Sequence, residues 1–207
     1  MKLYLKAGNG SQEKFPVIAR FAGLHDRFEL EQWTRHNAAS SPQGLRDAVS
    51  YAEEALSRWG RYQRENSAVE SVEAALTLIA AKDPPPEIAL LFVLEASWWE
   101  PGKPAAFAYL RRTSFGNLYL EYLAKHPLSF VPGLEFSGVS RAFFAWFGDI
   151  ATKLDSSFVW WEATVDSRNG YDKLFGAENL LDKSGLNDLF AVRSECLKTL
   201  ASGADKE

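Results

Sequence analysis

A short segment rich in small residues could bind an anion. It reads Phe136-Ser-Gly-Val-Ser-Arg141 and stands directly before the apolar positions of a predicted helix. Glycine and small side chains at a helix start let backbone N–H groups approach a negative group, and the helix dipole favours negative charge there. A simpler interpretation is an ordinary helix start, with Ser137 as the cap and Gly138 in the first turn. Short motifs of this kind often occur by chance, so the segment alone favours the simpler interpretation.

The elements around this segment would place it beside a sheet. Residues 118–123 alternate like a strand, apolar residues recur at helical spacing over 139–154, and residues 158–165 are predicted as a further strand. A strand, a helix and a strand form a βαβ unit, so the two strands should be parallel neighbours. Upstream, the predicted strands 88–98 and 105–112 flank a Pro/Gly turn and should form an antiparallel hairpin.

The other predicted elements complete a fold of mixed type. They are strands 2–6 and 15–21, a short helix that begins near Asp26, helices 45–59 and 68–81, a short helix 171–175 and a final strand 189–197. A capping box of Ser67 and Glu70 is predicted to start the second long helix. The sequence therefore predicts an α/β (α+β) fold with a mixed, mostly antiparallel central sheet and helices on both faces. Residues 1–42 are predicted as an N-terminal extension and 43–207 as the main domain.

Composition excludes several classes of function. The chain has 207 residues, 46% of them hydrophobic, and 27 acidic against 23 basic residues give a net charge of −4. A nucleic-acid partner is not expected, because such binding normally needs a basic surface. Cys196 is the single cysteine and the three histidines are scattered, so no structural metal site is predicted. No apolar stretch of membrane-spanning length and no signal-peptide pattern is present, so a soluble, cytoplasmic protein is expected.

From about residue 88 to 176 the chain resembles the GNAT superfamily of acyl-CoA-dependent N-acyltransferases. Four pieces stand in the family's order: the hairpin of 89–95 and 105–110, the strand that ends at His126-Pro127, the segment 137–147, and strand 158–165 followed by Tyr171-Asp-Lys-Leu-Phe-Gly176. The third piece is similar to the family's pyrophosphate loop and its helix. Residues 43–207 are thereby identified as a GNAT-like domain.

Three features depart from the family pattern. Glu135 stands where the family's loop usually has Arg or Gln, and Ser140 takes its last small position. Residues 127–138 form a longer and more apolar loop than usual, and Phe175-Gly176 stands in the reverse of the family's order. An acid beside a pyrophosphate is electrostatically unfavourable, so these departures bear on cofactor affinity more than on the fold.

The resemblance implies transfer of an acyl group from acetyl-CoA, or another acyl-CoA, to a primary amine on a small molecule, peptide or protein. In the family, backbone N–H groups of the strand before the loop polarise the thioester carbonyl. A tyrosine in the helix after the fifth strand often serves as general acid, and Tyr171 matches that position. The implied cofactor-binding residues are Leu123, Ala124 and Lys125 on the strand and Ser137, Gly138, Val139, Ser140 and Arg141 at the loop.

Glu121 is the first candidate for the base, acting directly or through water. Its neighbours Leu120 and Tyr122 suggest burial, which would make a carboxylate a better proton acceptor. The alternative is that strand alternation points Glu121 to solvent, and Glu162 is the reserve candidate.

A rival interpretation is a non-catalytic interaction or regulatory module that keeps the fold but has a filled cofactor cleft. Glu135 and the apolar residues 128–134 motivate it. Phe130 or Phe136 packed between the separated strands would favour it. An exposed tryptophan would point to an acceptor groove or to a homodimer surface. A serine hydrolase is set aside, because no Gly-x-Ser-x-Gly motif is present.

Overall fold

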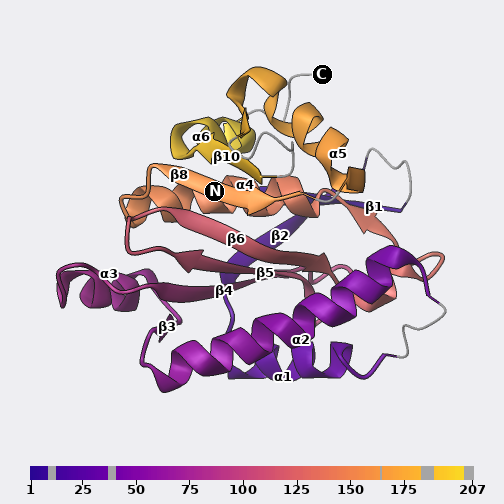
Figure 1. Cartoon of the computed structure of the whole chain (residues 1–207). Coiled ribbons are helices and arrows are strands. Elements are labelled where there is room, and N and C mark those ends of the chain that lie inside the picture. The colour runs from indigo at the N-terminus through magenta and orange to yellow at the C-terminus, as the bar shows by residue number, and fades with distance from the viewer. Residues whose placement is uncertain (9–12, 37–40, 164, 183–188, 203–207) are drawn as a thin grey trace.

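A computed structural model describes residues 1–8, 13–36, 41–163, 165–182 and 189–202 (Figure 1). The strands are β1 (Leu3–Ala7), β2 (Lys14–Phe21), β3 (Ala68–Val69), β4 (Ile88–Glu95), β5 (Pro104–Arg112), β6 (Leu118–Lys125), β7 (Phe136–Ser137), β8 (Phe158–Glu162), β9 (Leu181–Asp182) and β10 (Leu189–Arg193). The helices are α1 (Leu24–Trp33), α2 (Gln43–Arg64), α3 (Val72–Ala80), α4 (Val139–Lys153), α5 (Val165–Phe175) and α6 (Ser194–Ser202), with short 3₁₀ turns at Pro127–Phe130 and Ala177–Asn179.

The described strands form one mixed, mostly antiparallel sheet in the order β7-β1-β2-β4-β5-β6-β8-β10-β9, with β3 beside β4. The predicted hairpin β4–β5 is antiparallel, and β6 and β8 are parallel neighbours across α4, as the strand–helix–strand pattern predicts. The predicted fold class is therefore confirmed. Strand β2 pairs antiparallel with β4, so the N-terminal strands extend the same sheet.

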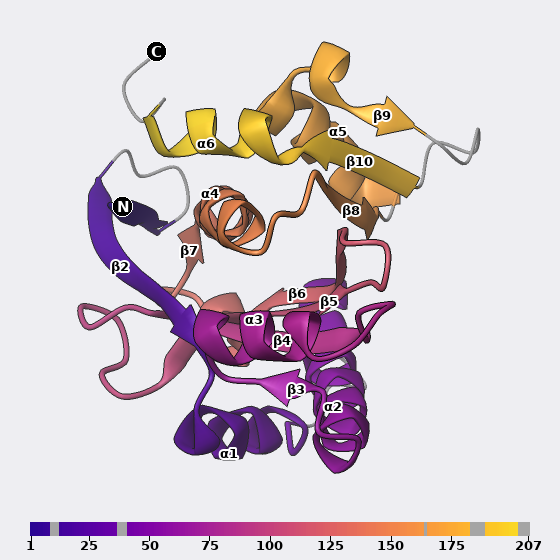
Figure 2. The same cartoon turned by 90° about the vertical axis from the view of Figure 1, so that its left-hand side faces the viewer.

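The sheet has a hydrophobic core on each face. Figure 2 shows α4 nearly end-on, with β2 to one side, β4–β6 below it and β8 and β10 to the other side. Aromatic residues on α4, among them Phe143, Phe144 and Phe147, fill this concave face. The opposite face is covered by α1 and α2. The buried Ala52 and Ala55 of α2 have small side chains, which let this helix approach the strands closely.

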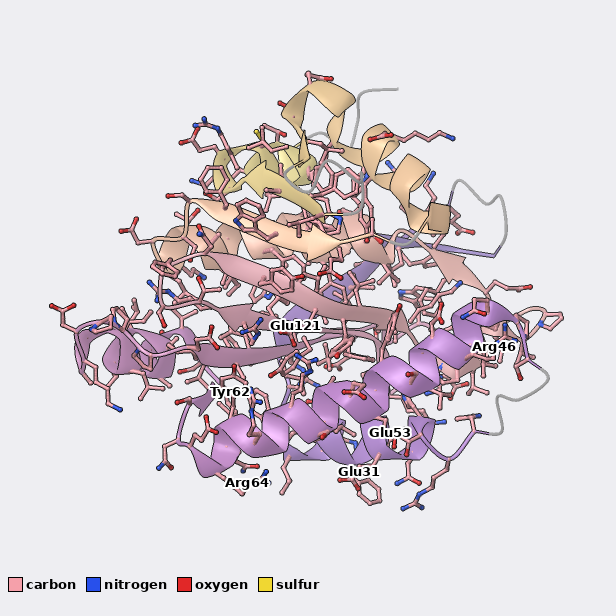
Figure 3. All side chains as sticks on the ribbon, in the orientation of Figure 1. Glu31, Arg46, Glu53, Tyr62, Arg64 and Glu121 are labelled. Atoms are coloured by element: carbon pink, nitrogen blue, oxygen red, sulfur yellow. The ribbon has the colours of Figure 1, made fainter. Side chains whose placement is uncertain are left out.

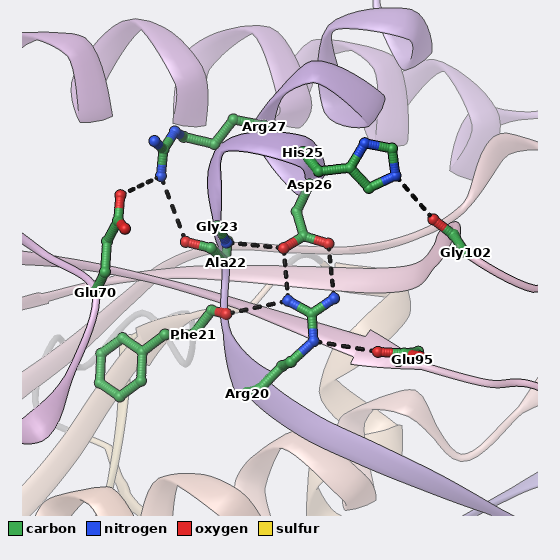
Figure 4. A network of polar contacts seen from close by, with 10 residues as sticks. All are labelled: Arg20, Phe21, Ala22, Gly23, His25, Asp26, Arg27, Glu70, Glu95 and Gly102. Carbon is green, nitrogen blue, oxygen red and sulfur yellow. Dashed lines mark hydrogen bonds and ion pairs between the residues drawn. The ribbon is translucent and has the colours of Figure 1, made fainter.

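An ion-pair network joins α1 to the sheet (Figure 4). Arg20 of β2 donates to both carboxylate oxygens of Asp26, at 2.6 and 3.0 Å, and also to Glu95 of β4 at 3.2 Å. Asp26 also accepts the Gly23 N–H at 2.7 Å, so it caps the helix from its third residue and not from in front of it. Since Asp26 is 3% exposed, Arg20 compensates a charge that burial would otherwise destabilise.

Several predicted boundaries and one predicted cap are wrong; the short helix predicted over 171–175, for example, begins at Val165 as α5. The helix predicted over 68–81 begins at Val72, because Ala68–Val69 pairs with β4 and the cap is Ser71, whose hydroxyl accepts the Ala74 N–H at 3.1 Å. The strand predicted over 189–197 ends at Arg193, and α6 follows immediately. Ser137 does not cap α4; it belongs to β7, and Gly138 is the cap residue.

Within the described residues, no helix is both long and apolar enough to cross a membrane. In the same part of the chain, no three His, Cys, Asp or Glu side chains converge as a metal-binding group would require.

Candidate active site

The site begins at a β-bulge in β6. Tyr109 of β5 pairs with Tyr122 and the next residue, Leu110, pairs with Leu120, so Glu121 is an extra residue in β6. The pairing of β6 with β8 covers Leu118 to Leu120 and stops at this bulge, whereas β6 continues to Lys125. A bulge bends its strand and increases the local twist. The bulge therefore marks the end of the β6–β8 pairing, and β8 itself ends at Glu162, one residue beyond its last paired residue.

Beyond the bulge, the edge of β6 that faces away from β5 pairs with no strand among the described residues. The His126 N–H donates to the Ala105 carbonyl of the neighbouring chain segment at 2.8 Å. Because N–H groups alternate along an antiparallel strand, the Ala124 N–H faces β5, and those of Leu123 and Lys125 face the opposite edge. Two backbone donors are therefore directed away from β5, beyond the end of the β6–β8 pairing.

The first turn of α4 supplies further backbone donors. Gly138 has a φ of 93°, a left-handed conformation that favours glycine, and it turns the chain from β7 into α4. The first amide bonded within the helix is that of Ala142, which donates to the Gly138 carbonyl at 3.0 Å. The N–H groups of Val139, Ser140 and Arg141 precede it and are free of helix bonds. This helix end is held in place by β1, which pairs with β7.

A cavity of about 450 Å³, here called the α4 cavity, opens at this helix end. Its walls are residues 136–141, Lys125, and Gly170, Tyr171 and Leu174 of α5. Two cations, Lys125 and the exposed Arg141, border it, and neither has an ion-pair partner among the described residues. Backbone donors, two serine hydroxyls and two cations together suit a phosphate-bearing ligand.

A second cavity of about 350 Å³, here called the α2 cavity, lies between α2 and β6. One face of α2, formed by Gly44, Asp47, Ala48 and Tyr51, makes its roof. Lys125, Val139, Ser140 and Tyr171 line both cavities. The two spaces therefore meet at Tyr171 and at the unpaired end of β6.

Tyr171 borders both cavities. Its ring packs against Trp161 of β8 and Phe144 of α4, with centroid distances of 5.2 and 5.8 Å. Burial, with a smaller contribution from Tyr51, raises the pKa of Tyr171 to about 12. The phenol is therefore protonated at neutral pH and can act as a donor.

Glu121 is anchored by two arginines. Its carboxylate accepts a hydrogen bond of 2.8 Å from Arg58 of α2 and a second from Arg111 of β5, and its side chain is 6% exposed. Figure 3 shows it between the sheet and α2. The prediction that strand alternation sends Glu121 to solvent is wrong, since α2 covers it. Its role as a base stays a prediction, and the two guanidinium groups disfavour it because both oxygens are engaged.

Glu135 does not project into the α4 cavity. Its carboxylate accepts the Gly133 N–H of its own loop at 2.7 Å, and its carbonyl accepts the Gly8 N–H at 2.7 Å. The residue is absent from the walls of both cavities. The acid at the family's Arg/Gln position is therefore turned onto the loop backbone.

Phe136 and Phe130, the two rings that the rival interpretation invokes, each form part of a cavity wall. Phe136 packs against Trp99, with a centroid distance of 5.0 Å, and borders the α4 cavity. Phe130 lies against Gly44 of α2 and borders the α2 cavity. Both cavities remain beside β6, with one of these rings in the wall of each, and the rival interpretation stays a prediction.

The predicted site residues gather around these two cavities. All ten line at least one of them: Glu121, Leu123, Ala124, Lys125, Ser137, Gly138, Val139, Ser140, Arg141 and Tyr171. Glu162 borders the α2 cavity and accepts a hydrogen bond from Tyr119 at 2.8 Å. Sequence reasoning missed Asp47 and Tyr51. Their spacing from Gly44 and Ala48 was a usable signal, because positions three and four apart share a helix face.

Comparison with known proteins gives similarity in fold. No family model and no curated protein matches the sequence. Among solved structures, the chain is similar to Mycobacterium smegmatis RimJ in complex with CoA-disulfide, with 13% identity, a TM-score of 0.49, and coverage of 98% of this chain and 94% of that one. A GNAT-family acetyltransferase from Staphylococcus aureus Mu50 has 7% identity and a TM-score of 0.48 over 86% of this chain and 99% of that one.

A third similarity covers less of the chain. Nourseothricin acetyltransferase has 16% identity and a TM-score of 0.36, over 51% of this chain and 65% of that one. At such identities and TM-scores, the likenesses concern the fold and carry no conclusion about activity or substrate.

Proposed function

We propose that the protein is a GNAT-like N-acyltransferase that moves an acyl group from acetyl-CoA, or another acyl-CoA, to a primary amine. The observation that carries the proposal is the meeting of the α4 and α2 cavities at Tyr171 and the unpaired end of β6. One cavity offers donors for phosphates, the other offers room for a second substrate, and a proton donor stands between them.

The residues around the α4 cavity fit the cofactor. The free N–H groups of Val139, Ser140 and Arg141 would hold the pyrophosphate, because they form the positive end of the α4 dipole. Lys125 and Arg141 add positive charge. When bound, the acyl-CoA supplies an activated carbonyl on a thiol leaving group.

The residues at the junction would perform three tasks. The N–H groups of Leu123 and Lys125 face the unpaired edge of β6 and would donate to an oxygen that gains negative charge. Tyr171 keeps its proton at neutral pH and would deliver it to the departing sulfur. Glu121 would hold the bulge, and the acceptor's proton would leave to solvent at the mouth of the α2 cavity.

The acceptor is proposed to enter through the α2 cavity. Its walls combine the rings of Tyr51 and Phe130 with the carboxylates of Asp47 and Glu162. Such a surface suits an amine carried by a small molecule or by an extended peptide or protein segment.

Thermal melting with acetyl-CoA tests the proposal. At about 100 times its dissociation constant, a bound ligand adds about 2.7 kcal/mol to the free energy of unfolding. The Ser140→Glu variant should keep its melting temperature, since an acid in the first turn favours the helix, but should lose the shift. Ser57→Glu, the same change on the exposed surface of α2, should still show the shift in melting temperature with acetyl-CoA. Absence of a shift in the parent protein at millimolar acetyl-CoA would overturn the proposal.

A further inference from the structure

Of the residues that line the two cavities within the described chain, Lys125 is the one lysine, and it belongs to both walls. Its ammonium nitrogen lies 4.6 Å from the centroid of the Phe130 ring. That ring borders the α2 cavity, where the acceptor amine is proposed to bind. A primary amine of the protein therefore already lies at the junction of the two cavities.

The surroundings of Lys125 differ from those of an ordinary surface lysine. The residue is half-buried, and no carboxylate forms an ion pair with it among the described residues. Burial lowers the pKa of Lys125, and the Glu135 carboxylate opposes this effect. A desolvated lysine is more often neutral than a hydrated one, and the neutral amine is the nucleophile.

We infer that Lys125 is itself an acyl acceptor, modified by the acyl-CoA that occupies the α4 cavity. This inference rests on the proposed function. Neutral Nζ of Lys125 attacks the thioester carbonyl carbon, so that an N–C bond forms and the C–S bond breaks. The electron pair of the C–S bond leaves with sulfur, which takes a proton from Tyr171. The extra proton on nitrogen passes to water, which returns one to Tyr171, and the products are an amide on Lys125 and free coenzyme A.

The modification would change both cavities. Acylation removes the positive charge that Lys125 presents to the α4 cavity and adds bulk beside Phe130 in the α2 cavity. The acylated protein should therefore bind coenzyme A more weakly than the unmodified protein, which makes the reaction self-limiting.

The test uses the whole purified chain with acetyl-CoA and no added amine. Intact mass spectrometry should show a gain of one acetyl group, and peptide mapping should place it on Lys125. Lys125→Arg, which keeps the charge, should abolish this gain. Lys103→Arg is the matched control: it removes a lysine that pairs with Glu100, and it should leave the gain unchanged.

A second readout needs no turnover. A limiting amount of acetic anhydride, added without cofactor, should label Lys125 before the exposed lysines, and coenzyme A should protect it. In Ser140→Glu, acetyl-CoA should no longer acylate Lys125, whereas the anhydride still should.

The outcomes distinguish acylation of Lys125 from the proposed acyltransferase function on which it rests. Coenzyme A binding without acetyl on Lys125 overturns the inference and leaves the proposed function standing. Equal labelling of many lysines by acetyl-CoA would mean that acylation does not depend on the cavity, and it would overturn the inference. Labelling of Lys125 by acetyl-CoA that persists in Ser140→Glu would overturn it for the same reason. Failure of the parent protein to bind coenzyme A overturns both.

Discussion

Arg58 of α2 donates a hydrogen bond of 2.8 Å to Glu121, the extra residue at the bulge of β6. The same carboxylate accepts from Arg111 of β5. The contact with Arg58 links α2 to the bulge at which the pairing of β6 with β8 ends. Glu121 therefore connects the roof of one cavity to the opening between the strands.

Glu121→Gln distinguishes an anchor from a base. Loss of a general base lowers turnover about 10²–10⁴-fold. As an anchor, the variant should lose about 1–3 kcal/mol of stability, because two charged hydrogen bonds are weakened, and its turnover should fall far less. The measurements are denaturant unfolding and thiol release from acetyl-CoA with the best acceptor of a panel of primary amines.

Glu53→Gln, on the exposed surface of α2, is the control for that experiment and should change neither quantity. A stable Glu121→Gln variant whose turnover is lost would show that Glu121 takes the proton.

Tyr171→Phe should lower turnover about 10²–10⁴-fold and leave the affinity for coenzyme A unchanged, because the ring packing stays and the proton is lost. Titration calorimetry measures the affinity, and thiol release measures the turnover. Tyr51→Phe removes the neighbouring phenol of the same cavity and serves as the control, with a much smaller effect. Equal turnover in Tyr171→Phe and the parent protein would remove Tyr171 from the acid role.

The buried His126 should make the protein sensitive to acid. It is 4% exposed, its ring contacts those of Trp33 and Trp99, and its Nδ1 accepts the Leu128 N–H at 3.0 Å. Burial, with smaller contributions from Lys103 and His36, lowers the pKa of His126 from 6.5 to about 3. Between these values the unfolded chain binds a proton that the folded chain does not, so the free energy of unfolding falls as pH falls from 6.5 towards 3.

His126→Asn keeps an acceptor for Leu128 and removes the titration, so unfolding measured across this pH range should decline less steeply. The exposed His36 offers a control in His36→Gln, which should follow the parent curve more closely. Parallel curves for His126→Asn and the parent protein would contradict this origin of the acid sensitivity.

Gly138→Ala tests the left-handed residue before α4. An added Cβ would lie 3.6 Å from the Tyr4 carbonyl oxygen, an ordinary contact, so the cost comes from φ and should be about 1–2 kcal/mol. Gly102→Ala, at a φ of 82° with nothing near its Cβ, should cost a similar amount. Coenzyme A should bind more weakly to the Gly138 variant alone, because only there do the amides of α4 shift. Identical affinities in the two variants would place the phosphate site elsewhere.

Much of the fold could be predicted because its periodic segments are long. The alternation in β6 and the apolar spacing of α4 predict a parallel β6–β8 pair, which is confirmed. The two-residue strands β3 and β7 carry no periodic signal, and each forms only because a distant strand pairs with it. The cap of α4 was misplaced for this reason, since pairing with β1 draws Ser137 into the sheet.

The candidate site was predictable in outline and not in detail. The glycine and serines at the start of α4 indicated free amides, and these border a cavity. The bulge could not be predicted, because it depends on how β5 and β6 align and not on β6 alone. It turns Glu121 and Tyr122 both towards α2, where strand alternation would separate them.

A structure of the complex with coenzyme A would show whether the free amides of α4 hold the pyrophosphate. The pyrophosphate should accept hydrogen bonds from the N–H groups of Val139, Ser140 and Arg141, with the thiol near Tyr171 and the Leu123 N–H. Coenzyme A bound elsewhere, or rings of the protein closing the space between β6 and β8, would contradict the account.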